Sequence, residues 1–176
     1  MREEAVVFGP TRSLVGVVTD PAQASSMPPQ TGVILLNSGL VHRVGPNRLY
    51  VKVARSLSRL GAVSLRFDLS GVGDSRVRQD NLPFPESSIE DTQEAMNLLS
   101  QTRGVERFVL LGICSGAINS FDVACRDSRV VGAVMINPLA YSDAFWSSVD
   151  DFQSLKNARS YWKGGLFNPM SWVPAL

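Results

Sequence analysis

Short apolar segments alternate with amphipathic segments along most of this chain. Six of the apolar segments have the length and composition of β-strands: Ala5 to Phe8, Leu14 to Thr19, Gly32 to Leu36, Ala62 to Leu69, Arg107 to Ile113 and Val130 to Ile136. Gly32 to Leu36 is a continuous apolar run, which fits a strand that is buried on both faces of a parallel sheet. The first two are joined by a Gly9-Pro10 turn and predict an edge hairpin.

Amphipathic segments between the later strands predict helices. Pro46, after Gly45, is a start signal for the first, and Ser87 and Glu90 form a capping box that should open the second. The three expected helices cover residues 45–61, 87–104 and 115–126. Strands that alternate with helices predict an α/β fold, with a mostly parallel sheet, right-handed crossovers and helices on both faces.

The amino-acid composition of the chain changes after residue 138. All three tryptophans and several other aromatic residues lie in residues 139–176, where helical periodicity is weak. This segment is either an amphipathic layer that only packs on the core or the beginning of a helical cap over a pocket. We therefore expect a partial α/β core at residues 1–138 and a partial cap or lid at residues 139–176.

Charge and hydropathy narrow the class of partner. Lys plus Arg number 17 and Asp plus Glu number 16, so the net charge is +1 and no basic field attracts nucleic acid or anionic lipid. The apolar runs are far shorter than the roughly 20 residues of a membrane helix, and the first residues do not form a signal peptide. The expected partner is a small-molecule substrate, and the expected location is the cytoplasm.

Cysteine and histidine are scarce. Neither of the two cysteines belongs to a pair or cluster with metal-ligand spacing, and His42 is the single histidine. We expect neither a metal nor another cofactor. Cys125, next to Val123 and Ala124 in a predicted helix, is expected to be an ordinary core residue.

The motif with the most chemical content is Gly112-Ile113-Cys114-Ser115-Gly116-Ala117, at the junction of a predicted strand and a predicted helix. Its spacing is that of a nucleophile elbow, G-x-S-x-G, with cysteine in place of serine. The sharp turn needs small residues two before and two after the nucleophile, which Gly112 and Gly116 provide. Ser115 is the alternative nucleophile, but Ile113 would then crowd the turn, so Cys114 is favoured.

Together with two further loops, this motif resembles the α/β-hydrolase superfamily, and within it the serine-aminopeptidase-like branch that includes hydrolases associated with the exosortase system. Asn37 to Arg48 is similar to the oxyanion loop of that branch, and Phe67 to Ser75 is similar to its D-x-x-G-x-G-x-S loop. The resemblance covers about residues 5 to 138. Within it, Gly71 and Gly73 shape a loop beside the pocket rather than a dinucleotide fingerprint, and Asp68 and Asp74 are expected to bond backbone amides.

The resemblance implies an acyl hydrolase that acts on an ester, a thioester or a related bond. Cys114 would be the nucleophile, an occupant of this position that also occurs in dienelactone hydrolase. The oxyanion would be held by the amide of Ser115 and by that of Gly39 or Leu40. His42 and Arg43 would border the pocket and bind substrate.

The sequence departs from the family pattern after the elbow. The triad of this superfamily runs nucleophile, acid, histidine, and no histidine follows Cys114 before Leu176. The sequence is then expected to be either a fragment or a shortened relative, nearly inactive by itself. His42 could act as the base in place of the missing histidine, but this alternative is less favoured. The aspartates after the elbow, including Asp122, are expected to lie on a solvated surface.

A non-catalytic function is the second hypothesis. In it, the chain is an α/β-hydrolase-like binding domain or a subunit completed by a partner. The exposed sheet edge at Val130 to Ile136 would then be covered by a second copy or by another chain.

Overall fold

The computed structural model describes residues 1–22 and 31–138. Its six strands are β1 (Glu3–Phe8), β2 (Leu14–Thr19), β3 (Thr31–Leu36), β4 (Val63–Asp68), β5 (Arg107–Ile113) and β6 (Val130–Ile136). The helices are a short 3₁₀ turn, η1 (Pro46–Arg48), followed by α1 (Leu49–Arg59), α2 (Phe84–Arg103) and α3 (Ser115–Arg126). The predicted segment 139–176 lies outside the described residues, so its expected role as a cap stays a prediction.

The six strands form one sheet in the order β1-β2-β4-β3-β5-β6. β1 and β2 form the predicted antiparallel hairpin, β2 is antiparallel to β4, and the pairs β4–β3, β3–β5 and β5–β6 are parallel. Leu36 is in register with Gly112, and Ile113 with Ile136. The loops that follow β3, β5 and β6 therefore leave the sheet at the same edge.

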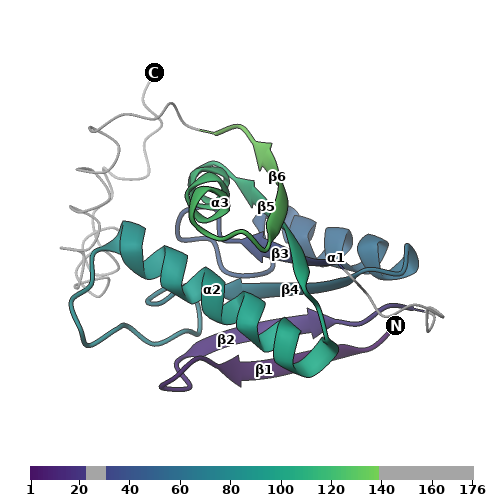
Figure 1. Cartoon of the computed structure of the whole chain (residues 1–176), viewed down its shortest axis with the longest axis horizontal. Helices are drawn as coiled ribbons and strands as arrows, with labels where there is room; N and C mark the ends of the chain where they lie inside the picture. The colour runs from purple at the N-terminus through teal and green to yellow at the C-terminus, as the bar shows by residue number, and fades with distance from the viewer. Residues whose placement is uncertain (23–30, 139–176) are drawn as a thin grey trace, which may run out of the picture. The chain divides into compact units, whose positions relative to one another are not determined.

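Helices cover both faces of the sheet, as the alternating pattern predicted. α1 lies on one face, and α2 and α3 lie together on the other (Figure 1). The larger core cluster, on the face of α2 and α3, includes Met96, Leu99 and Phe108, whereas the smaller cluster joins Leu35 to Tyr50 and Ala54 of α1. None of the helices in the described part of the chain is long and apolar enough to cross a membrane.

The predicted start of α2 is wrong. The helix begins at Phe84, with Pro85 in its first turn, and Ser87 is already a buried helical residue. Its hydroxyl donates a hydrogen bond to the carbonyl of Phe84 at 3.1 Å instead of capping an amide. The proline at the first turn opens the helix because its fixed φ suits that position and its missing N–H is not needed there. The predicted end is confirmed, since Gly104 closes α2 with φ 68°.

The predicted start of the first helix, residue 45, is four residues early. Pro46 opens only the 3₁₀ turn, and Asn47 and Arg48 have left-handed backbone angles, so α1 starts at Leu49. At its other end, Leu60 follows the helix and is 82% exposed rather than packed.

Two expectations about α3 are wrong, although its bounds are confirmed. Cys125 is exposed instead of buried, because it shares an outward face with Phe121, four residues earlier. Asp122, expected to be solvated, is buried on the face that packs on the sheet and α2. Helical periodicity shows which residues share a face, but the neighbours of the helix decide which face is covered.

Candidate active site

Cys114 occupies a sharp turn between β5 and α3. Its backbone angles are φ 58° and ψ −118°, and its amide donates a hydrogen bond to the carbonyl of Ile136 at 2.9 Å. A non-glycine residue with positive φ outside the left-handed helical region is strained, and such strain is concentrated at functional sites. The strained residue of the predicted elbow is therefore Cys114, and Ser115 is the first residue of the helix.

The two glycines of the motif are required by close backbone contacts. A Cβ atom at Gly112 would lie 2.0 Å from the carbonyl oxygen of Gly116. A Cβ atom at Gly116 would lie 2.4 Å from the carbonyl oxygen of Asn37, at the end of β3. The backbone of the elbow is therefore in close contact with β5 and with the loop that follows β3.

The loop after β3 reaches the elbow through Gly39. The amide of Gly39 donates a hydrogen bond to Oγ of Ser115 at 2.7 Å. Leu40 follows at the exposed tip of this loop, and the amide of Val41 closes a turn on the carbonyl of Ser38 at 3.0 Å. The structure thus brings Gly39 into contact with Ser115, the residue after Cys114, and the predicted roles of these residues stay predictions.

Asn37 joins this loop to the next one. Its Nδ2 donates to the carbonyl of Val41 at 2.9 Å, and its Oδ1 accepts a hydrogen bond from the amide of Leu69 at 2.8 Å. The residue is 1% exposed. Sequence reasoning did not single out Asn37, although an amide side chain directly after a buried strand is a signal for such an anchor.

Asp68, at the end of β4, is the other anchor of the loop. Its side chain is fully buried and accepts hydrogen bonds from the amide of Arg43 at 2.6 Å and from the amide of Asp74 at 3.2 Å. It also forms an ion pair with the guanidinium of Arg43. The expectation that Asp68 bonds backbone amides is confirmed, whereas the carboxylate of Asp74 pairs with Nη2 of Arg43 at 2.7 Å.

Arg43 therefore joins the loop after β3 to the loop after β4 through its ion pairs with Asp68 and Asp74. Burial by itself lowers the pKa of Arg43, but hydrogen bonds to Asp74 and Asp68 outweigh this effect and raise it. Two carboxylates balance the charge of the guanidinium, whose side chain is 20% exposed. Its predicted contact with substrate stays a prediction.

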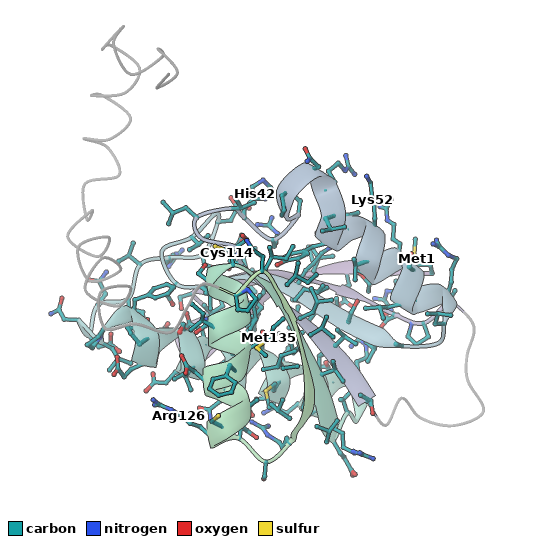
Figure 2. All side chains as sticks on the ribbon, turned by 90° about the horizontal axis from the view of Figure 1, so that it is seen from above. Met1, His42, Lys52, Cys114, Arg126 and Met135 are labelled. Atoms are coloured by element: carbon teal, nitrogen blue, oxygen red, sulfur yellow. The ribbon has the colours of Figure 1, made fainter. Side chains whose placement is uncertain are left out.

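His42 lies in the same loop but is exposed. In Figure 2, His42 and Cys114 lie toward the same end of the sheet, and Arg126, in the last turn of α3, lies toward the other end. This placement follows from the topology, because the loops after β3 and β5 leave at one edge.

Tyr50 contacts the end of β3 from the face of the sheet that α1 covers. Its hydroxyl donates to the carbonyl of Leu36 at 2.8 Å, and burial raises the pKa of Tyr50 to about 12. Gly45 packs on its ring, since a Cβ atom there would lie 2.7 Å from Cγ of Tyr50. Tyr50 lies in the helix that the sequence predicted over residues 45–61, but the sequence did not reveal this polar contact beneath the site.

Within the residues that the structure describes, no group of three or more His, Cys, Asp or Glu side chains could hold a metal ion. This region offers the thiol of Cys114, which lies on a strained backbone turn and next to the first amides of α3. The amide of Ala117 already donates to the carbonyl of Cys114, so the amides available to a ligand are those of Ser115 and Gly116.

A nucleophile elbow on a mostly parallel sheet defines the class of protein. Residues 32–168 match the family model for the alpha/beta hydrolase fold. The chain belongs to the α/β-hydrolase family.

Individual relatives agree with this assignment. Esterase EstD of Thermotoga maritima is 31% identical over 130 residues, which are 72% of this chain and 31% of that protein. The structure is similar to that of an alpha-beta serine hydrolase homologue from Coxiella burnetii, with 24% identity, a TM-score of 0.62, and coverage of 84% of this chain and 67% of the other. It is also similar to a cold-adapted esterase from an Arctic intertidal metagenomic library, with 23% identity, a TM-score of 0.57, and coverage of 76% and 58%.

Proposed function

We propose that this chain carries the nucleophile of an acyl hydrolase that acts on an ester, a thioester or a related bond. The strained backbone of Cys114 at the start of α3 is the observation that carries the proposal. Kinship with an esterase supports this reaction class. The order of the three loops supports the serine-aminopeptidase-like branch, which includes hydrolases associated with the exosortase system.

In the proposed reaction, the thiolate of Cys114 attacks the carbonyl carbon of the substrate. The carbonyl oxygen becomes an oxyanion that accepts hydrogen bonds from the amide of Ser115 and from that of Gly39 or Leu40. Collapse of the tetrahedral intermediate expels the alcohol or thiol and leaves a thioester on Cys114. Water then hydrolyses this thioester, which releases the acid and restores the thiol.

A general base is required for turnover, because it activates the water that hydrolyses the thioester, and it also speeds removal of the proton from Cys114. No histidine follows Cys114 in the printed sequence, and the match to the esterase covers 31% of that protein. We propose that the acid and the histidine come from the remainder of a longer protein or from a partner chain, and that the chain by itself turns over slowly. His42 and Arg43 are proposed to border the pocket, His42 through its exposed ring.

The proposal is tested by the acylation of Cys114. The chain is mixed with p-nitrophenyl butyrate, the release of p-nitrophenolate is followed, and the modified peptide is identified by mass spectrometry. We expect a stoichiometric burst with one butyryl group on Cys114, and loss of that burst in Cys114→Ala. Cys125→Ala is the matched control, because it removes the other, exposed thiol and should leave the burst intact. Equal bursts from the wild type and Cys114→Ala would overturn the proposal.

Both cysteines are free thiols. Free thiols are typical of a reducing compartment, which supports a cytoplasmic location. The small-molecule acyl substrate is proposed because the net charge of +1 provides no basic field for nucleic acid or anionic lipid.

A partner-completed or non-catalytic domain is the second candidate, and β6 is the feature that favours it. β6 is one of the two edge strands of the described sheet, and four of its apolar residues are each 43–46% exposed: Val131, Val134, Met135 and Ile136. An edge strand with apolar side chains is a site for strand addition by a second copy or another chain. Sedimentation at several concentrations tests the homo-oligomer, and a monomer throughout would contradict it.

A further inference from the structure

The nucleophile elbow and the loop after β3 are connected by a hydrogen bond that none of the roles above explains. Oγ of Ser115 accepts the amide proton of Gly39 at 2.7 Å, across 76 residues of sequence. The bond joins the residue next to Cys114 to the loop expected to complete the oxyanion hole.

Apart from the turn that the amide of Val41 closes on the carbonyl of Ser38, the tip of that loop has few contacts in the described part of the chain. No atom lies within 4 Å of the position of a Cβ atom at Gly39, whose φ is 54°, and Leu40 is 68% exposed. The flanks, in contrast, are tied down, because Asn37 binds the carbonyl of Val41 and Asp68 binds the amide of Arg43. The turn fixes the local shape of the Gly39-Leu40 peptide, and the hydroxyl of Ser115 is what joins that peptide to the elbow.

This hydrogen bond also distinguishes between the two candidate donors. An amide has one proton, and that of Gly39 is directed at Ser115. The amide of Leu40 is the next one along the loop.

We propose that Ser115 is a positioning residue, whose hydroxyl holds Gly39 so that the amides of Leu40 and Ser115, and not that of Gly39, form the oxyanion hole. This inference rests on the proposed acyl transfer at Cys114. Ser115 thus has two separate roles: its backbone donates to the oxyanion, and its side chain places the second donor.

The hydrogen bond is tested first, by amide exchange measured with NMR on Ser115→Ala and Ser115→Thr. We expect exchange of the Gly39 amide to accelerate at least about tenfold in Ser115→Ala and to stay near the wild-type rate in Ser115→Thr, which keeps a hydroxyl. Ser56→Ala, a change on the exposed part of α1, is the control for a general effect of removing a hydroxyl. Unchanged exchange at Gly39 in Ser115→Ala would overturn the inference, whether or not the chain is catalytic.

The positioning role is tested second, by the rate of Cys114 acylation with p-nitrophenyl butyrate. We expect Ser115→Ala to lower the rate constant of acylation about 3- to 10-fold with little change in the substrate concentration at half-saturation, and Ser115→Thr to restore it. An equal or faster rate in Ser115→Ala would overturn the role. That outcome is distinct from failure of the proposed function, in which Cys114→Ala itself would react like the wild type.

Discussion

A methyl group at Gly112 would meet the carbonyl oxygen of Gly116 at 2.0 Å, so the strand that enters the elbow and the helix that leaves it touch through their backbones. The atom in the way is backbone, which cannot move aside without breaking the turn at Cys114. We expect Gly112→Ala to lower the free energy of unfolding by about 3 kcal/mol or more, or to prevent folding. Urea denaturation measures the loss.

Gly132 of β6 is the matched control for that prediction. A Cβ atom there would lie 3.8 Å from Cγ2 of Val109, which is ordinary contact. Gly132→Ala should change the free energy of unfolding by no more than about 1 kcal/mol, in the stabilising direction, because alanine restricts the unfolded chain. Similar losses for the two variants would show that the elbow is not a close backbone contact.

Gly73 should be less replaceable than Gly71, although both have left-handed backbone angles, φ 54° and φ 80°. A Cβ atom at Gly73 would lie 2.4 Å from Oδ2 of the buried Asp68, whereas at Gly71 the nearest atom is Cγ2 of Val77 at 3.7 Å. Each alanine variant should lose about 1 kcal/mol of stability for its backbone conformation, and Gly73→Ala about 1–2 kcal/mol more. Thermal and urea unfolding of both variants compare these losses, and equal values would contradict the contact.

Asp68 and Asp74 both pair with Arg43, but their removal should have unequal effects. The Asp68 side chain is 0% exposed and that of Asp74 is 67% exposed. Asp68→Asn should lower the free energy of unfolding by about 2–4 kcal/mol, because it leaves Arg43 partly buried with less compensation. Asp74→Asn should lower it by less than about 0.5 kcal/mol, because water screens that pair. Denaturant midpoints measure both, and a large loss for Asp74→Asn would contradict this account of the loop.

Asp127, after the end of α3, should make the stability depend on pH. Hydrogen bonds from Arg129 lower the pKa of Asp127 below its ordinary value of 3.8, and the carboxylate accepts the Arg129 amide at 3.0 Å and Nη2 at 2.7 Å. A lowered folded-state pKa contributes stability above the unfolded-state pKa and loses it as pH falls through the folded-state pKa. Asp127→Asn should therefore cost about 1 kcal/mol at pH 7, and the difference from the wild type should shrink below about pH 4.

The measurement for Asp127 is urea unfolding of both chains at pH 7, 5 and 3. Arg55→Gln is a useful comparison, since its partner Glu3, whose pKa is also lowered, lies in an exposed ion pair. That variant should leave the stability almost unchanged, because water screens an exposed ion pair. A difference between the wild type and Asp127→Asn that stays constant with pH would contradict the ion pair as its cause.

Much of the architecture could be predicted from local pattern. β2, β5, β6 and α3 have the bounds that the sequence indicated, because each is a run of apolar or amphipathic residues bounded by turn residues. The start of α2 and the exposed face of α3 depended on more than pattern. Ser87 and Glu90 have the spacing of a capping box, yet α2 starts earlier, at Phe84, directly after Pro83 and with a proline in its first turn. Cys125 lies on a helix face whose exposure depends on what packs against α3.

The sequence by itself determined the elbow. Gly112, Cys114 and Gly116 are close in the chain, and their sizes alone select the residue that can occupy the strained turn. The tertiary structure decided what surrounds the elbow. It formed the contact of Gly116 with Asn37, the ion pair between Asp68 and Arg43, and the hydrogen bond from Gly39 to Ser115. Each joins segments 25 or more residues apart, so it exists only once β3, β4 and β5 pair in register and bring their loops to one edge of the sheet.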